Sequence, residues 1–285
     1  GTGATRDVVV DYSGVQLEVM AGSDGQTVVL DTDGSIGELA RAAGNVKLDL
    51  FGFVSLSGDL AFESSERSVK LFGGETVATD ALLVGGKGVN AFVGVGSGQA
   101  DAIGLQLNNA EFGLALLSAS NDASRNWTSF QATASSLSFV GIEGLTASAS
   151  GISVFINQAG KTGDKVVDYG WKDSANTSLG RTTALSIPTG ASSTLTLSMA
   201  GSEGEIIKAA AGLDLDLFGF FSVKGNFAVE QRSQQVVLSD GSVIKQADLV
   251  TIGASNVDAF AGVRAGQDDA IGLKLGQVNF GLALI

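Results

Sequence analysis

The stretch LDLFGFVSLSGDLAFE, residues 48–63, decides the fold of this chain, because it alternates in hydrophobicity and occurs twice. Its second copy, LDLFGFFSVKGNFAVE, spans residues 215–230. In the first copy every even position from Val46 to Phe62 is apolar or glycine, and most odd positions are polar. A period of two places alternate side chains on opposite faces of a β-strand. The stretch therefore predicts β-structure with one apolar face.

This alternation runs for longer than an ordinary strand, and glycines interrupt both copies at matching places. These glycines are Gly52 and Gly58 in the first copy and Gly219 and Gly225 in the second. Because glycine inside a strand marks a bulge or a bend, we interpret the stretch as one strand that bends along a curved sheet or crosses between two sheets. Phe51 and Phe53, on its polar face, would then cover a second, smaller core or pack against the next layer.

The repeat extends over most of the chain of 285 residues. Phe51 aligns with Phe218 at an offset of 167, and between residues 98–117 and 266–285 the two copies are identical at 13 of 20 positions. Self-similarity at a fixed period is typical of tandem arrays. We expect a complete first unit at residues 1–165 and a truncated second unit at 166–285. Because the chain begins at Gly1 and stops partway through a unit, we also expect it to be a fragment of a longer array.

Other segments show the same period of two, with Val15, Leu17 and Val19 as one example. The apolar phase changes between Leu107 and Phe112, where Asn108-Asn109 would supply either one extra residue or a turn. Turn signals occur at the pairs Asp33-Gly34, Gly73-Gly74 and Asp240-Gly241, of which the last two align between the copies and suit tight hairpins. IGELARAAG and EGEIIKAAAG are the two candidates for short helices. The sequence thus predicts an all-β, mostly antiparallel and elongated tandem array, built either from sandwich-like units or from one continuous curved sheet.

Composition excludes several functions. The formal net charge is -13, which repels nucleic acid and anionic headgroups, so we expect neither as a partner. The absence of cysteine removes disulfides and thiolate sites, and the absence of histidine removes the commonest general base and metal ligand. No apolar run is long enough for a transmembrane segment. The partners that we expect are neighbouring repeats of the same chain.

Calcium is the strongest candidate ligand. GSGQADAIG and RAGQDDAIG, at residues 96–104 and 264–272, place acids beside glycines in both copies. Hard cations prefer oxygen ligands, so Asp101, Asp268 and Asp269 are the candidate calcium ligands. Only Asp101 and Asp269 match, and the calcium nonapeptide G-G-x-G-x-D is missing, so an ordinary loop is the favoured interpretation. The acids of DTDGS at 31–35 have no counterpart in the second copy and indicate a hairpin turn.

The sequence also bears on two further functions, catalysis by a pair of carboxylates and binding of a ligand in a groove. A pair of carboxylates can cleave glycosides without histidine, but the matched acids fall mostly on polar strand faces or in turns, where we expect solvent exposure. Among them are Glu38/Glu205, Asp49/Asp216, Glu63/Glu230, Asp80/Asp248 and Asp101/Asp269. We therefore expect no enzyme, no catalytic residue and no cofactor. Alternatively, long strands with a continuous apolar face would line a groove for a lipid, a carbohydrate or another apolar chain, whereas the ordinary role of such a face is to form the core.

The segments FGFVSLSGDLAFE, NAFVGVGSGQADAIGLQL and FGLALL resemble the tandem repeats of very large, secreted, adhesin-like bacterial proteins. The resemblance lies in an acidic, cysteine-free, glycine-rich and β-patterned composition and covers nearly the whole chain. It implies a secreted or cell-surface location and a role as an extender module that spaces or presents adhesive domains.

Overall fold

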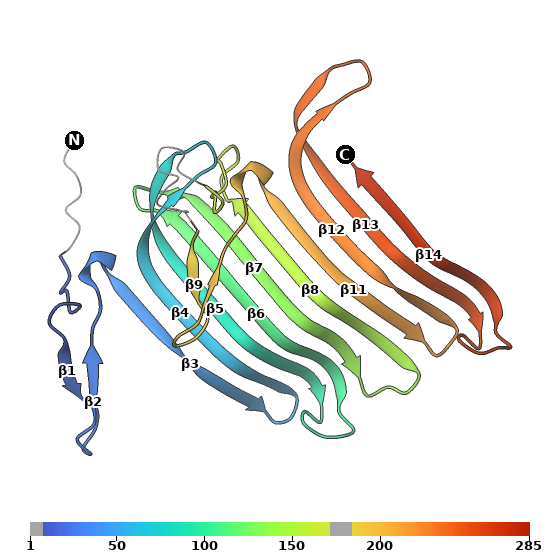
Figure 1. Ribbon diagram of the computed structural model, residues 1–285, viewed down its shortest axis with the longest axis horizontal. Helices are drawn as coiled ribbons and strands as arrows, with labels where there is room; N and C mark the ends of the chain where they lie inside the picture. The colour runs from blue at the N-terminus through green and yellow to red at the C-terminus, as the bar shows by residue number, and fades with distance from the viewer. Residues whose placement is uncertain (1–7, 172–183) are drawn as a thin grey trace.

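The computed structural model describes residues 8–171 and 184–285 and is dominated by one antiparallel sheet of ten strands. The strands are β3 (Leu39–Leu50), β4 (Val54–Lys70), β5 (Thr76–Val95), β6 (Ile103–Ala119), β7 (Asp122–Val140), β8 (Leu145–Ala159), β11 (Ile206–Leu217), β12 (Phe221–Val237), β13 (Val243–Val263) and β14 (Ile271–Leu284). Each strand pairs with its neighbour in this order, so the sheet is a meander (Figure 1). The prediction of an elongated all-β fold is confirmed, and the sheet is continuous rather than divided into sandwiches.

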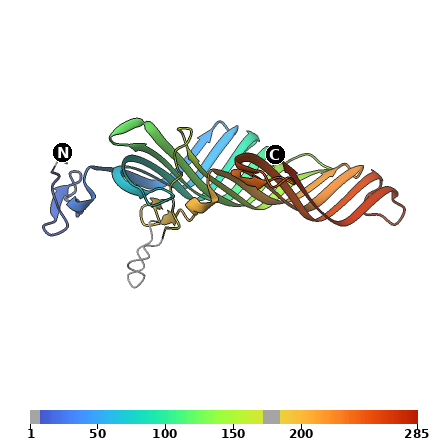
Figure 2. The same ribbon diagram turned by 90° about the horizontal axis from the view of Figure 1, so that it is seen from above.

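Two short hairpins accompany the sheet. One is formed by β1 (Leu17–Met20) and β2 (Thr27–Leu30), and the other by β9 (Ser186–Pro188) and β10 (Thr194–Thr196). Each is followed by a 3-10 turn, η1 (Gly34–Ile36) or η3 (Gly201–Glu203). The β9–β10 hairpin contacts β4, β5 and β6, whereas Figures 1 and 2 both place the β1–β2 hairpin beyond the β3 edge, away from the sheet. The two hairpins thus occupy different surroundings.

The predicted bent strand at residues 48–63 is wrong, because the chain reverses there. Phe51 and Gly52 have φ values of 55° and 73°, and Phe53 N donates to Leu50 O at 2.9 Å. Asp49 Oδ1 accepts from Gly52 N at 3.0 Å, and Asp216 makes the same contact with Gly219 N in the second copy. Because Leu50 pairs with Val54, even-numbered residues of both strands share a face. The alternation of apolar and polar residues therefore continues through the turn, and in the sequence it cannot be told from that of a single strand.

The phenylalanines at this turn do not cover a second core. Phe51 is 94% exposed and Phe53 is 57% exposed, and Phe218 and Phe220 are exposed at the matching turn. Residues 51–53 form the turn between β3 and β4, so these rings lie at the tip of a hairpin. Their prediction as core residues is wrong.

The two predicted helices are also wrong, since both segments begin strands. Leu39 pairs with Ser65, and Ile206 pairs with both Asn157 and Arg232. A short alanine-rich helix is marginal by itself, whereas strand pairing gives β11 hydrogen-bond partners on both sides and gives β3, at the edge of the sheet, partners on its β4 side. Asp33-Gly34 opens η1 instead of a hairpin, whereas Gly73-Gly74 and Asp240-Gly241 do connect β4 to β5 and β12 to β13.

The predicted units share one sheet, and the predicted boundary at 165/166 lies six residues after the end of β8 at Ala159. Residues 1–7 and 172–183 of the two predicted units lie outside the described residues. Strands β11–β14 repeat β3–β6, and β11 pairs with β8 from Ile206↔Asn157 to Leu217↔Leu145. The segment that begins the second unit packs on the sheet of the first. The hydrophobic core of the first unit is therefore completed by residues that the sequence repeat assigns to the second unit.

Candidate functional site

The first candidate site is the contact between the β9–β10 hairpin and the sheet. The hairpin belongs to a cap segment, residues 165–171 and 184–203, which we name the second cap segment. Its apolar side chains Val167, Tyr169, Ile187 and Leu197 are fully or almost fully buried. They pack with buried residues of β4–β7, namely Val69, Val77, Ala81, Leu83, Ala115, Leu117, Ala119 and Trp127. This contact is the main hydrophobic core of the described chain.

Glycines in the sheet allow the hairpin backbone to approach closely. A Cβ atom at Gly85 would lie 2.1 Å from Pro188 O, and one at Gly113 would lie 2.9 Å from Ile187 Cδ1. Gly85 and Gly113 are direct cross-strand partners in β5 and β6. A glycine inside a strand often marks such an approach of another backbone. The pair therefore forms the seat on which the hairpin rests.

A buried polar chain fixes the position of the second cap segment over β7 and β8. Tyr169 Oη donates to Ser129 Oγ at 2.7 Å, and Ser129 Oγ donates to Asn157 Oδ1 at 3.0 Å. Asn157 Nδ2 in turn donates to Val167 O at 2.8 Å. Burial raises the pKa of Tyr169, so the phenol remains a donor. Buried polar groups of this kind need all their partners, and therefore specify one docked position.

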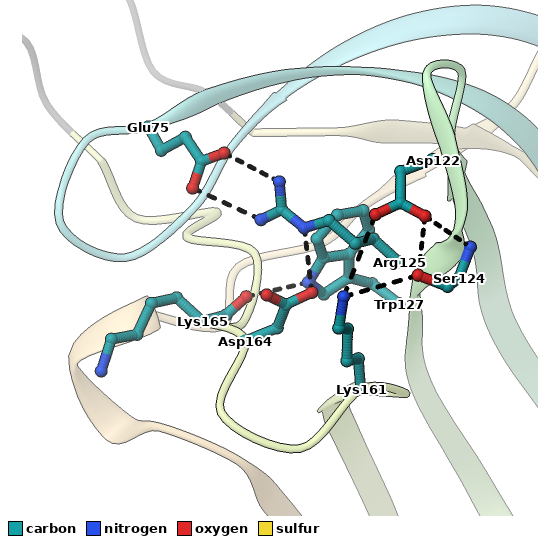
Figure 3. A network of polar contacts seen from close by, with 8 residues as sticks. All are labelled: Glu75, Asp122, Ser124, Arg125, Trp127, Lys161, Asp164 and Lys165. Atoms are coloured by element: carbon teal, nitrogen blue, oxygen red, sulfur yellow. Dashed lines mark hydrogen bonds and ion pairs between the residues drawn. The ribbon is translucent and has the colours of Figure 1, made fainter.

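Ion pairs hold the start of the same segment, as Figure 3 shows. Arg125 donates to Glu75 at 2.9 Å and to Asp164 at 3.0 Å, and its guanidinium lies 5.3 Å from the Trp127 ring centre. Hydrogen bonds to Glu75 and Asp164 raise the pKa of Arg125. Trp127 Nε1 donates to Lys165 O at 2.8 Å. The contacts connect the β4–β5 turn, β7 and the beginning of the cap segment.

A neighbouring contact in Figure 3 closes the β6–β7 turn. Asp122 accepts hydrogen bonds from both the hydroxyl and the backbone amide of Ser124, and these hydrogen bonds lower the pKa of Asp122. Lys161 Nζ lies 3.9 Å from Asp122. These contacts connect the start of β7 to Lys161, which follows β8.

Glu63 is the one sequence candidate that the structure buries, with 1% of its side chain exposed. It accepts from Arg67 and Ser65 and pairs with Arg41 at 2.8 Å. Burial alone would raise the pKa of Glu63, but the hydrogen bonds from Arg67 and Ser65 and the charges of Arg67 and Arg41 lower it overall. The prediction of solvent exposure is wrong for this residue, because the second cap segment covers its strand.

The second candidate site is the opposite face of the sheet, which we name the bare face. One of its rows runs across neighbouring strands through Phe62, Val84, Leu114, Phe130 and Ile156. Many of its large apolar side chains are more than a third exposed: Leu48, Leu50, Phe62, Val93, Leu105, Leu116, Leu213, Val229, Leu273, Phe280 and Leu282. Contiguous apolar surface of this extent indicates an interaction site.

β-bulges keep the bare face apolar over the full length of the strands. Asn109 has a φ of 49° and adds one residue to β6, so that Leu107 and Ala110 both lie on the bare face. Gln277 does the same in β14, with a φ of 53°. Asn109 N donates to Asn90 Oδ1 at 2.9 Å, and Gln277 N donates to Asp258 Oδ1 at 3.1 Å. The phase change predicted at Asn108-Asn109 is confirmed.

The calcium candidates lie in two separate hairpin turns. Asp101 is exposed in the β5–β6 turn, and Asp268 and Asp269 are exposed in the β13–β14 turn. Asp269 is paired with Arg264. Within residues 8–171 and 184–285, no group of three or more acids is arranged to hold a metal ion. The structure therefore does not bring the three aspartates together, and calcium binding stays a prediction.

The sequence analysis missed that the cap segment is itself repeated. Val9-Val10-Asp11-Tyr12 recurs as Val166-Val167-Asp168-Tyr169. The offset is 157 rather than 167, so an ungapped comparison does not register it, whereas a comparison that allows a gap would. Residues 8–35 therefore form a first cap segment, with β1–β2 as its hairpin.

No family model matches the chain, and neither a curated protein nor a solved structure shows significant similarity to it. The described residues contain no helix with the length and hydrophobicity that crossing a membrane requires. The class that fold and surfaces define is a tandem β-repeat module with one continuous sheet.

Proposed function

We propose that this chain is a structural extender repeat of a large secreted or cell-surface bacterial protein, in which it spaces or presents adhesive domains. One observation carries the proposal: the contact between units is ordinary strand pairing, from β8 to β11, and repeats the pairing within a unit. Each further unit would then lengthen the array by adding strands to the same sheet, without a separate type of interface between units. Approximately additive unit and neighbour terms are typical of repeat proteins.

The sheet also sets the length that each unit contributes. A unit supplies six strands, β3–β8, and neighbouring strands lie about 4.8 Å apart, so each unit adds roughly 29 Å across the strands. The acidic surface, with a net charge of -13, opposes lateral clumping of similar strand edges. The acidic, glycine-rich composition shared with adhesin-like repeats supports the surface location.

Small-angle X-ray scattering on covalent tandems tests the extender role. We expect the maximum dimension to grow by roughly 29 Å with each added copy of residues 39–205. Replacing Gly85 and Gly113, the glycines beneath the β9–β10 hairpin, alters the packing of the cap without removing the strand pairing and serves as a control for that packing. A maximum dimension that stays constant, or grows only as a compact globule does, would rule out the extender role.

A second function, binding of an apolar ligand such as an acyl chain, is favoured by the bare face. Val93 and Leu105 are cross-strand partners on that face, and both are largely exposed. Replacing both by asparagine is expected to weaken binding of a fluorescent fatty acid several-fold. The matched control replaces Gln106 and Ser138, which are partners on the other face of the same sheet. Equal affinity in both variants would exclude ligand binding at this part of the bare face.

A further inference from the structure

The two cap segments share the same local fold. Asp11 Oδ1 accepts from Gly34 N at 3.2 Å, and Asp168 Oδ1 accepts from Gly201 N at 2.8 Å. Tyr12 N donates to Thr32 O at 2.9 Å, as Tyr169 N does to Met199 O at 3.1 Å. The same carboxylate and the same backbone contact therefore connect the VVDY motif to the segment after each hairpin.

Their hairpins also carry equivalent apolar side chains. Leu17 and Val19 of β1 correspond to Leu185 and Ile187, because Leu17 pairs with Leu30 and Leu197 N donates to Leu185 O. Val28 and Leu30 of β2 correspond to Leu195 and Leu197. The alternation places these four residues of each hairpin on one face. The first cap segment thus has the apolar face that the second cap segment uses to dock.

Within residues 8–171 and 184–285, only one of these equivalent faces is covered. Ile187 and Leu197 are fully buried, whereas Leu17 is 45%, Val19 43% and Leu30 37% exposed. Val10 is 63% exposed, although its counterpart Val167 is almost fully buried. The exposed face of the first cap segment is made of apolar side chains, and the hairpin that carries it lies beyond the β3 edge, away from the sheet (Figures 1 and 2).

The second unit carries the matching seat. Gly253 and Gly281 are cross-strand partners in β13 and β14, and correspond to Gly85 and Gly113. Among the described residues, no atom lies within 4 Å of a Cβ built at either glycine. A hollow of about 430 Å³ lies here, with Glu230 and Thr251 also in its lining. Glycine is not needed at either position for packing within the described chain, but a docked hairpin would require it.

We infer that the chain associates head to tail, with the first cap segment of one copy docked on the β12–β14 seat of a second copy. This inference rests on the proposed extender function and supplies its contact between chains. The two surfaces are different, so the interface is heterologous and propagates as an open string rather than closing on itself. The contact that we infer consists of the first cap segment, residues 8–35, against β12–β14. A contact made by one short segment belongs to the small, transient class of protein–protein interfaces.

Sedimentation velocity on the full chain tests the inference. The average mass of the wild-type protein is expected to increase as its concentration is raised to several hundred micromolar, since small interfaces are weak. Gly253→Val places a side chain where the hairpin would dock, and Val19→Asp puts a charge on the apolar face of the first cap segment. Each variant alone is therefore expected to remain monomeric. Ile252→Asn changes the bare face of the same strand and is the matched control, which is expected to associate like the wild type.

Mixing the two defective variants separates this model from the alternatives. Gly253→Val retains a sound cap and Val19→Asp retains a sound seat, so an equimolar mixture is expected to form 1:1 dimers and nothing larger. A monomeric wild type, or no dimer in the mixture, overturns the inference. Association that persists in both variants but is lost in Ile252→Asn assigns the contact to the bare face instead. Either result leaves the covalent-tandem scattering experiment free to support or reject the extender function by itself.

Discussion

Replacing Gly85 by alanine places a methyl group where the β9–β10 hairpin now lies. The new Cβ would be 2.1 Å from Pro188 O and 3.0 Å from Thr189 Cγ2, whereas ordinary contact begins at 3.4 Å. The Pro188 carbonyl therefore has to withdraw by more than 1 Å. Gly253→Ala is the matched control, because it makes the same substitution at the equivalent position of β13, where the described chain has no atom within 4 Å.

Two responses are available to the hairpin, and their magnitudes decide between them. Detachment would expose the buried side chains of Val167, Ile187 and Leu197, at about 1.5–3 kcal/mol each. Overpacking in a closed core costs about 1–3 kcal/mol in total. Because detachment costs more, we expect the hairpin to shift and remain docked. Gly85→Ala is then destabilising by about 1–3 kcal/mol, whereas Gly253→Ala is stabilising by roughly 0.5–1 kcal/mol, since alanine is favoured over glycine in a strand.

Urea unfolding at low protein concentration measures the difference, with tryptophan fluorescence and far-UV circular dichroism recorded together. Trp127 is buried in the affected core, and Trp171 lies beside Gly74 of the same unit, so fluorescence reports on the first unit. Dichroism reports on both units. Equal changes in the free energy of unfolding for the two alanine variants would refute the assignment of Gly85 as the seat of the hairpin.

Four further predictions follow from particular contacts. Glu63→Gln is expected to destabilise the protein at neutral pH. Because the pKa of Glu63 is lower in the folded state than its ordinary value of 4.5, the loss of stability is present above pH 4.5 and disappears as the pH falls through the lowered pKa. Free energies of unfolding measured across pH for the wild type and the variant will show this. Tyr169→Phe is expected to cost about 0.5–1.5 kcal/mol, and Asn157→Ala about 1–3 kcal/mol because Val167 O and the Ser129 hydroxyl lose a partner; equal costs in urea unfolding would contradict the buried chain. Phe51→Asn is expected to be stabilising by about 1 kcal/mol, since the residue is exposed and asparagine adopts a positive φ at lower cost; a lower melting temperature would contradict this. Calcium and a chelator are expected to give the same thermal midpoint, because the candidate aspartates are not clustered; a calcium-dependent rise would reverse that expectation.

The period of two in residues 46–63 predicts both the β-class and the apolar face, because side-chain direction in a strand depends only on position along it. The reversal at residues 51–53 could not be distinguished from a bend. Leu50 opposite Val54 keeps the parity of the alternation, and the turn contains a phenylalanine at positive φ where asparagine or glycine is usual. The continuous sheet likewise depends on pairing between β8 and β11, which local pattern does not specify.

The contact between the second cap segment and the sheet was harder to predict from the sequence than the fold. Glu63 occupies a polar position of an alternating strand, and its burial results from a cap segment that begins about 100 residues later. The glycines at 85 and 113 resemble other strand glycines until the hairpin above them is known. The VVDY repeat was visible in principle, but its different spacing concealed it from an ungapped comparison.

The offset between repeat and core has a practical consequence for dissecting the molecule. A fragment cut at the sequence boundary, residues 1–165, would retain the strands of one unit but lose Tyr169, Ile187 and Leu197, which complete its hydrophobic interior. A fragment from 39 to 205 would keep strands and covering together. The smallest fragment that folds by itself is therefore expected to span the junction between the two sequence repeats. When one unit unfolds, the cap segment at the start of the next unit would lose the sheet on which it packs.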